Sequence, residues 1–152
     1  MAESLFRDTS LCVIGNINRD LKTTPFRATP GLFEDGETSV DAIVETLGGG
    51  GANSAAAAAT LGARVAMLGN IGDDVLGRRL TAVLRGLGID TRLRCDPEQA
   101  TGTTLALTFD HGSRHFVGSL PNNRALSDAD LDLSGLGVYA HLLRADIWFS
   151  EA

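Results

Sequence analysis

The chain has 152 residues, of which 43% are hydrophobic and 21% are charged, an ordinary profile for a single globular domain. Its formal net charge of −6 and its sequence pI of about 4.9 do not fit the basic surface that nucleic-acid binding requires. Because it has neither a long apolar run nor a signal-peptide layout, we expect a cytoplasmic protein with no membrane partner. The two cysteines and three histidines are scattered, so the sequence predicts no metal site.

The first elements predicted along the chain are a buried strand and a polar segment. Residues 11–15, LCVIG, form a short apolar run of the kind found in strands buried on both faces. The polar stretch that follows places Asn16, Asn18 and Asp20 at the carboxyl end of this strand. An irregular connection comes next, and residues 37–47 then alternate like an exposed β-strand.

A run of four glycines, Gly48 to Gly51, precedes an alanine-rich segment. Asn53 is a favourable N-cap for a helix over residues 54–61. Alanine side chains are small, so the backbone of this helix can lie close against a sheet. Four consecutive glycines lose much backbone entropy on folding, and a run of this kind therefore calls for a structural or functional reason.

Further elements alternate between strands and helices. Residues 64–69 predict a buried strand, and residues 75–87 predict an amphipathic helix that Asp73 or Asp74 caps. Alternating segments around an Asp/Gly turn at residues 110–113 predict a β-hairpin.

The last two predicted elements are a helix over residues 136–143 and a strand over residues 146–151. The complete order is strand, β insert, helix, strand, helix, β insert, helix, strand. This order predicts an α/β fold with a parallel sheet and antiparallel additions.

Several known motifs could explain the glycine run. A phosphate-binding P-loop needs G-x-x-x-x-G-K-[ST], and the lone lysine lies far upstream, so a P-loop is excluded. A dinucleotide fingerprint belongs in the turn after the first strand and needs a third glycine where Asn53 stands, which disfavours a nicotinamide enzyme. No G-x-S-x-G elbow is present, so an α/β-hydrolase nucleophile has no support.

Two interpretations of the glycine run remain open. In the first, the glycines only permit a tight turn, and Asn53 only caps the helix. In the second, the bare main chain and Asn53 bind a ligand together with Asn18 and Asp20. One carboxylate, two amides and exposed N–H groups match the hydrogen-bonding needs of sugar hydroxyls.

Six segments, in chain order, carry a resemblance to a known family: GNINRD, GGGGANSAAAAATLGA, GNIGDDVLG, LRGLGIDT, TGTTLALTF and GSRHFVGS. Together they resemble the amino-terminal half of the PfkB, or ribokinase-like, carbohydrate kinases. The resemblance implies that residues 1–152 form the sugar-binding part of one ribokinase-like domain, at about half the family length. Its fold would be a mostly parallel, Rossmann-like sheet flanked by helices, with a small antiparallel β lid at about 37–47 and 103–119.

The resemblance also implies which residues bind the substrate. The family's sugar-binding aspartate falls on Asp20, with Asn18 beside it, and a later sugar-contacting acid falls on Glu151. Phe116 is a candidate apolar contact from the lid. The expected contacts of the glycine loop are Gly49, Gly50, Gly51 and Asn53.

The reaction implied by the resemblance is ATP-dependent phosphorylation of a sugar or sugar-like hydroxyl. The family's catalytic aspartate lies in a G-A-G-D stretch, which this sequence lacks. We therefore expect the catalytic base and the sites for ATP and Mg²⁺ in a carboxyl-terminal half, and we expect this chain alone to be inactive and to bind neither. A homodimer formed through the lid is a further implication. The alternative is a non-catalytic sugar-binding or regulatory module.

Overall fold

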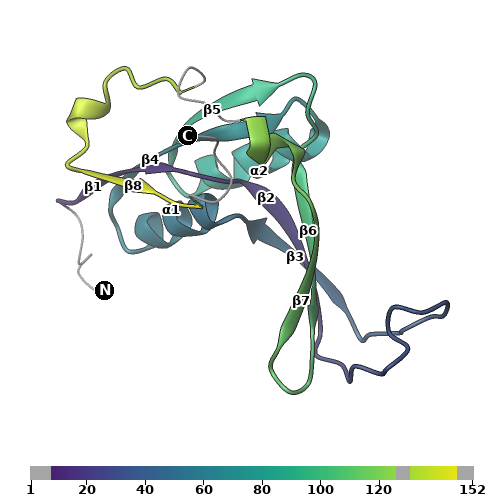
Figure 1. The fold of residues 1–152 in the computed structure, drawn as a ribbon. Coiled ribbons are helices and arrows are strands. Elements are labelled where there is room, and N and C mark those ends of the chain that lie inside the picture. Colours follow the sequence, from purple (N-terminus) through teal and green to yellow (C-terminus); the bar gives the residue numbers. More distant parts are fainter. Residues whose placement is uncertain (1–7, 126–130, 147–152) are drawn as a thin grey trace.

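The computed structural model describes residues 8–125 and 131–146, which form two four-stranded sheets (Figure 1). The first is parallel and has, in spatial order, the strands β5 (Asp90–Asp96), β4 (Arg64–Gly72), β1 (Ser10–Ile14) and β8 (His141–Arg144). The second, here called the arm sheet, has the order β3 (Ile43–Gly48), β2 (Asn18–Thr23), β6 (Gly102–Thr108) and β7 (Arg114–Ser119). Its central pair β2–β6 is parallel, and both outer pairs are antiparallel.

The main core lies between the parallel sheet and the helices α1 (Gly50–Thr60) and α2 (Val75–Gly86). Every residue of β4 after Arg64 is buried, as the apolar sequence of this strand predicts. The opposite face of the sheet carries a smaller cluster, on which Leu131, Leu136 and Tyr139 pack. The parallel sheet is therefore covered on both faces. The buried members of the main core are Val13, Ile17, Ala52, Ala55, Val65, Met67, Ile71, Leu80, Leu84 and Ile89.

Both helices end at glycines, but α1 begins earlier than the sequence predicts. Gly62 and Gly88, with φ of 93° and 77°, follow the two helices as expected. The prediction that Asn53 caps α1 is wrong, because the helix starts at Gly50 and its N-cap is Gly49. Glycine at this position allows a φ of 89°, which a residue with a side chain rarely adopts.

Three segments differ from their predicted structure. Residues 18–23, predicted as part of a polar connection, form the strand β2, and residues 90–96 form β5, which the sequence analysis did not predict. The predicted helix over residues 136–143 is wrong. It is replaced by a short 3-10 turn, Leu136–Val138, and by β8, whose backbone pairs with the exposed edge of β1. Of the predicted strand over 146–151, residues 147–151 lie outside the described residues.

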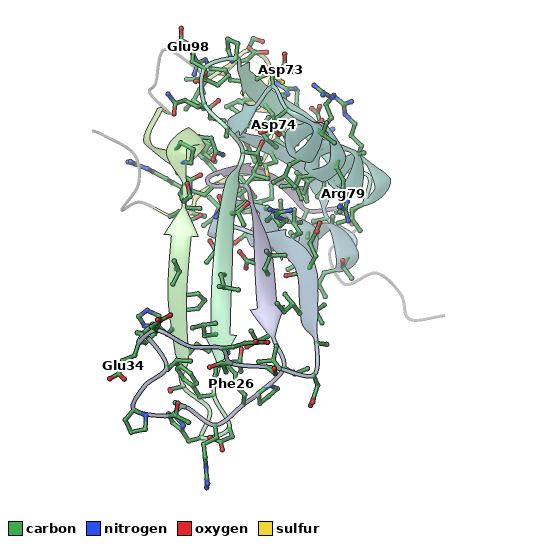
Figure 2. All side chains as sticks on the ribbon, turned by 90° about the vertical axis from the view of Figure 1, so that its right-hand side faces the viewer. Phe26, Glu34, Asp73, Asp74, Arg79 and Glu98 are labelled. Atoms are coloured by element: carbon green, nitrogen blue, oxygen red, sulfur yellow. The ribbon has the colours of Figure 1, made fainter. Side chains whose placement is uncertain are left out.

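The arm sheet projects from the helix-covered body, as Figure 1 shows. The β6–β7 hairpin confirms the predicted turn, with Gly112 at a φ of 90°. Figure 2 shows Phe26 and Glu34, from the connection between β2 and β3, at the far end of the arm. There Phe26 packs edge-on against Phe109, with ring centroids 5.3 Å apart. Among the described residues, no helix combines the length and apolar character needed to span a membrane.

Candidate functional site

Asn18 and Asp20 lie on one face of β2, at the end of the arm sheet nearest the body. Asn18 is paired on one side with Gly48 and on the other with Gly102. Asp20 occupies the next row on that face, between Thr46 and Thr104. Because cross-strand partners project to the same side of a sheet, these residues share a polar face. The glycines on either side of Asn18 leave room beside its buried side chain.

The opposite face of the arm sheet is directed toward α2. Glu45, one residue out of phase with Thr46, forms an ion pair with Arg79 of α2 at 3.0 Å. Figure 2 shows Arg79 on that helix, beside the base of the arm. The Asn18–Asp20 face therefore points away from α2.

The glycine run lets two carboxylates lie directly against the main chain. A Cβ atom on Gly48 would collide with the carboxylate of Asp20, and one on Gly50 would collide with the carboxylate of Asp146. Gly48 and Gly50 are two residues apart, which is at most about 7 Å along the chain. The carboxylates of Asp20 and Asp146 therefore contact neighbouring parts of one short segment. A Cβ on Gly49 would meet the carbonyl oxygen of Asn16. Any side chain at these positions would have to displace one of these groups.

Asp146 is held at the amino terminus of α1. Its Oδ2 accepts hydrogen bonds from the N–H groups of Gly51, at 2.9 Å, and of Asn16, at 3.3 Å. Asp146 has a φ of 58°, in the left-handed region that aspartate tolerates better than most residues. A carboxylate at this place also interacts favourably with the positive end of the helix dipole. Asp146 therefore binds the first turn of α1, which begins with Gly50 and Gly51.

Burial makes ionisation of Asp20 costly. The side chain of Asp20 is 16% exposed, and burial raises the pKa of its carboxyl above the ordinary value of 3.8. Lys22 acts in the opposite direction, with its Nζ atom 3.7 Å from Asp20 Oδ2. A half-buried carboxylate with one loosely placed cation is poised to accept hydrogen bonds from a ligand.

Two polar atoms that are unpartnered among the described residues lie in the rows of Asn18 and Asp20. Within the described part of the chain, the buried atoms Asn18 Oδ1 and Thr46 Oγ1 have no hydrogen-bond partner. Asn18 is only 5% exposed, so leaving its oxygen unpaired has an energetic cost. Both atoms belong to the two rows that carry Asn18 and Asp20. This pattern is typical of a site that is completed by a ligand or by water.

A pair of buried asparagines connects the arm sheet to the body. Asn122 lies just after β7 and is fully buried, and its Nδ2 donates to the carbonyl oxygens of Ile17 and Asn70. Asn70 Nδ2 donates in return to the carbonyl oxygen of Asn122. These bonds fix the connection between β1 and β2, and so the position of Asn18. This pair was not predicted from the sequence, because the two residues are 52 positions apart.

Asp74 confirms its predicted role as a cap and has a second one. Its Oδ1 accepts from the N–H of Gly77 at 2.6 Å, and its carboxylate also binds the N–H and hydroxyl of Thr101. Burial acts to raise the pKa of Asp74, but the hydrogen bonds from Thr101 and Gly77 outweigh burial and lower it. Because Thr101 immediately precedes β6, Asp74 attaches the base of the arm to α2.

The remaining predicted site residues are not all gathered in one place. Gly49 caps α1, and Gly50 and Gly51 form its first turn beside Asp146. Asn53 lies within α1 and is exposed. Phe116 shares the face of Asp20 through its row with Ala106 and Lys22, and it is 57% exposed. Glu151 lies outside the described residues.

Asp146 is a candidate site residue that was not predicted from the sequence. The strand predicted over residues 146–151 placed Asp146 at the start of a strand, and not after the end of one. In the structure β8 ends at Arg144, so Asp146 is the acid that reaches the glycine run from this strand. In residues 8–125 and 131–146, no group of three or more histidine, cysteine, aspartate or glutamate side chains is placed to hold a metal ion.

A parallel sheet with a projecting arm, whose polar face adjoins a glycine-rich helix start, is a ribokinase-like α/β fold. Residues 8–142 match the model of the pfkB family of carbohydrate kinases, and the chain belongs to this family. The structure of a ribokinase from Cryptococcus neoformans in complex with ADP superposes with a TM-score of 0.72 and 28% identity, covering 90% of this chain and 42% of that one.

Curated relatives give the same family assignment. The ribokinase of Haemophilus influenzae is 40% identical over 121 residues, which are 78% of this chain and 38% of that protein. The ribokinase of Bacillus subtilis is 40% identical over 83 residues, which are 54% of this chain and 27% of that protein. The chain therefore spans well under half the length of these relatives.

Proposed function

We propose that this chain supplies the sugar-binding half and the lid of an ATP-dependent carbohydrate kinase. The observation that carries the proposal is the polar face of the arm sheet, where Asn18, Thr46 and Asp20 lie next to the glycine run. Two of the polar atoms on this face are buried without a partner in the described chain. Sugar hydroxyls both donate and accept hydrogen bonds, so they fit such a face.

Each group on this face has a distinct task in the proposal. The carboxylate of Asp20 accepts hydrogen bonds from neighbouring hydroxyls, and the Oδ1 of Asn18 accepts another. Gly49, Gly50 and Gly51 are retained as proposed main-chain contacts of the sugar, beside the Asp146 carboxylate that lies against Gly50. Asn53 and Glu151 are also proposed as sugar contacts, because the family resemblance implies them.

The arm sheet is proposed to act as the lid. Phe116 then packs an apolar side chain against the carbon face of the sugar, and lid closure excludes water from the transferred group. The arm also exposes apolar side chains, and we propose that two copies of the chain associate through it. Its exposed apolar residues include Ile43, Val44, Phe116 and Val117. Sedimentation equilibrium of the wild type and of a Val44→Glu variant tests the dimer.

Catalysis is proposed to reside in a carboxyl-terminal half. ADP occupies the related Cryptococcus ribokinase, which supports nucleotide use by the family. The described residues do not assemble a donor set for Mg²⁺, so we derive no step through that ion. When bound elsewhere in a complete kinase, MgATP supplies the phosphoryl group, while the residues described here hold and orient the accepting hydroxyl. We place the protein in the cytoplasm.

The proposal is tested by titrating neutral sugars into the chain and following binding by ligand-observed NMR. Asp20→Ala is expected to weaken binding by about 10- to 150-fold, because a charge-assisted hydrogen bond contributes about 1.5–3 kcal/mol. The control is Asp110→Ala, which removes an exposed carboxylate at the β6–β7 turn. Equal losses in the two variants, or no sugar binding at all, would contradict the proposal. ATP turnover by the isolated chain would contradict the placement of catalysis.

A further inference from the structure

The hydrogen-bonding groups around the glycine run are predominantly acceptors. Asp20 lies over Gly48 and Asp146 lies over Gly50, so two carboxylates flank one short loop. The amide oxygen of Asn18 is a third acceptor, more than nine-tenths buried and unpartnered within the described residues. A ligand in contact with these groups must bring hydrogen-bond donors.

Four main-chain donors at this place are already engaged by the protein. At the start of α1, the N–H groups of Gly51, Ala52 and Asn53 bond to Asp146, to the carbonyl of Asn16 and to the carbonyl of Gly49. The N–H of Asn16, at the end of β1, also donates to Asp146. A helix amino terminus normally attracts an anion, but here an internal carboxylate already takes that place.

The amide oxygen of Asn122 also lacks a hydrogen-bond donor in the described chain. Asn122 uses its Nδ2 for two carbonyl oxygens, which fixes the orientation of its amide and directs its Oδ1 elsewhere. A Cβ on Gly102 would lie 2.9 Å from this Oδ1 and 3.0 Å from the Oδ1 of Asn18. Both oxygens therefore adjoin Gly102, and both are unpartnered in the described chain. Hydroxyl or water hydrogens can satisfy them, whereas a carboxylate or phosphate cannot.

We infer that the site selects neutral, hydroxyl-rich ligands and rejects sugar acids and sugar phosphates, and that Asp146 sets this preference. The inference rests on the proposed sugar-binding function and narrows its substrate class. An acidic ligand would meet two carboxylates and one nearby lysine, Lys22, which is already paired with Asp20. It would also have to displace Asp146 to reach the end of the helix.

The test compares each neutral sugar with an acid of related structure. The pairs are D-glucose with D-glucuronate, D-ribose with D-ribonate, and D-fructose with 2-keto-3-deoxygluconate, each titrated into the full chain. We expect at least one neutral sugar to bind and its acid partner to bind about tenfold more weakly or worse. Raising the salt concentration from ~0.01 M to ~1 M should reduce this ratio, because the Debye length falls from about 30 to about 3 Å.

Asp146→Asn isolates the contribution of the charge. Asparagine also tolerates a positive φ and keeps an oxygen for the N–H of Gly51, so the fold should be preserved. We expect the discrimination between neutral and acidic partners to fall about tenfold in this variant. Asp146→Ser is a second uncharged variant, used in case asparagine perturbs the loop. It should show the same fall in discrimination. Glu34→Gln changes the net charge equally at the far end of the arm (Figure 2) and should leave the ratio unchanged.

The possible outcomes separate the two proposals. If an acid binds as tightly as its neutral partner, the charge preference is refuted while the sugar site stands. If the ratio is the same in Asp146→Asn and in the wild type, Asp146 does not set it and the inference is refuted. If no sugar or acid binds at all, the proposed function fails and the inference fails with it.

Discussion

Gly15 and Gly51 contact each other main chain to main chain. A Cβ on Gly51 would lie 2.6 Å from the carbonyl carbon of Gly15, and a Cβ on Gly15 would lie 2.9 Å from the Cα of Gly51. This contact brings the end of β1 against the first turn of α1. Packing against Gly15 therefore explains why residue 51 is a glycine. Gly48 and Gly50 are glycines because the carboxylates of Asp20 and Asp146 lie against them.

The Gly15–Gly51 contact predicts that Gly51→Ala destabilises the fold. Overpacking of this kind costs about 1–3 kcal/mol, and here both opposing groups are main chain and cannot rotate away. Gly86→Ala is the control, because nothing lies within 4 Å of a Cβ at Gly86, the last residue of α2. Alanine there should be neutral or stabilising by up to about 1 kcal/mol. Urea unfolding of both variants measures the difference, and similar midpoints would contradict the packing argument.

Asp20→Asn should stabilise the free protein at neutral pH while weakening sugar binding. The folded-state pKa of Asp20 is raised, so the contribution of its neutral form to stability is present at low pH and lost as pH rises through that pKa. An uncharged amide does not suffer this loss. Thermal unfolding from pH 3 to pH 7 should therefore show an advantage of the variant that grows with pH. A constant difference across the series would argue against a buried, costly carboxylate.

Asp74→Ala should lower the free energy of unfolding by about 1–3 kcal/mol, because it removes the cap of α2 and the bonds to Thr101. The lowered pKa of Asp74 means that its contribution is present at neutral pH and lost as pH falls through that pKa. The variant should therefore lose less stability on acidification. Asp73→Ala, at a side chain that is 60% exposed, should cost under about 1 kcal/mol.

Asn122→Ala is expected to cost more than Asn123→Ala. The first change leaves the buried carbonyl oxygens of Ile17 and Asn70 without this donor, at about 1–3 kcal/mol for an unsatisfied group. The amide atoms of Asn123 are buried without a partner among the described residues, so their removal sacrifices no bond seen there. Chemical denaturation of the two variants provides the comparison. The reverse order would show that Asn122 does not attach the arm to the body.

Phe116→Ala should weaken sugar binding severalfold with little effect on stability, because Phe116 is 57% exposed and shares the face of Asp20. Val117→Ala is a matched control, since Val117 is 52% exposed and projects to the opposite face. Titration of the same neutral sugar into both variants tests the assignment. Equal affinities would remove Phe116 from the proposed site.

The elements that the sequence predicted correctly have local signals. The run at residues 11–15, the amphipathic helix that begins after Asp74, and the hairpin around Gly112 are each defined by residues close together in the chain. The strand β2 was missed because its sequence, NRDLKT, is polar, and its parallel partner β6 begins 84 positions later in the pairing of Asn18 with Gly102. The helix predicted over 136–143 failed because its residues complete the sheet beside β1.

Only part of the candidate site was predictable, because some of its contacts join residues that are far apart in the chain. Asn18 and Asp20 adjoin the glycine run as proposed from the sequence, because β2 pairs antiparallel with β3 and sets Asn18 opposite Gly48. Asp146 was not predicted, because its contact with Gly51 joins residues 95 positions apart and depends on where β8 ends. Asn53 was predicted as a cap from its residue type, but the helix begins at Gly50, next to the contact of Gly51 with Gly15.

Asn18 and Asp20 are part of the arm sheet, whereas the first turn of α1 and Asp146 belong to the body. A rotation of the arm about its base would therefore change the distance between two sets of proposed ligand-binding groups, and not merely uncover a preformed pocket. Affinity and arm position would then be thermodynamically linked, so that substitutions at the base of the arm, far from any hydroxyl, alter the dissociation constant.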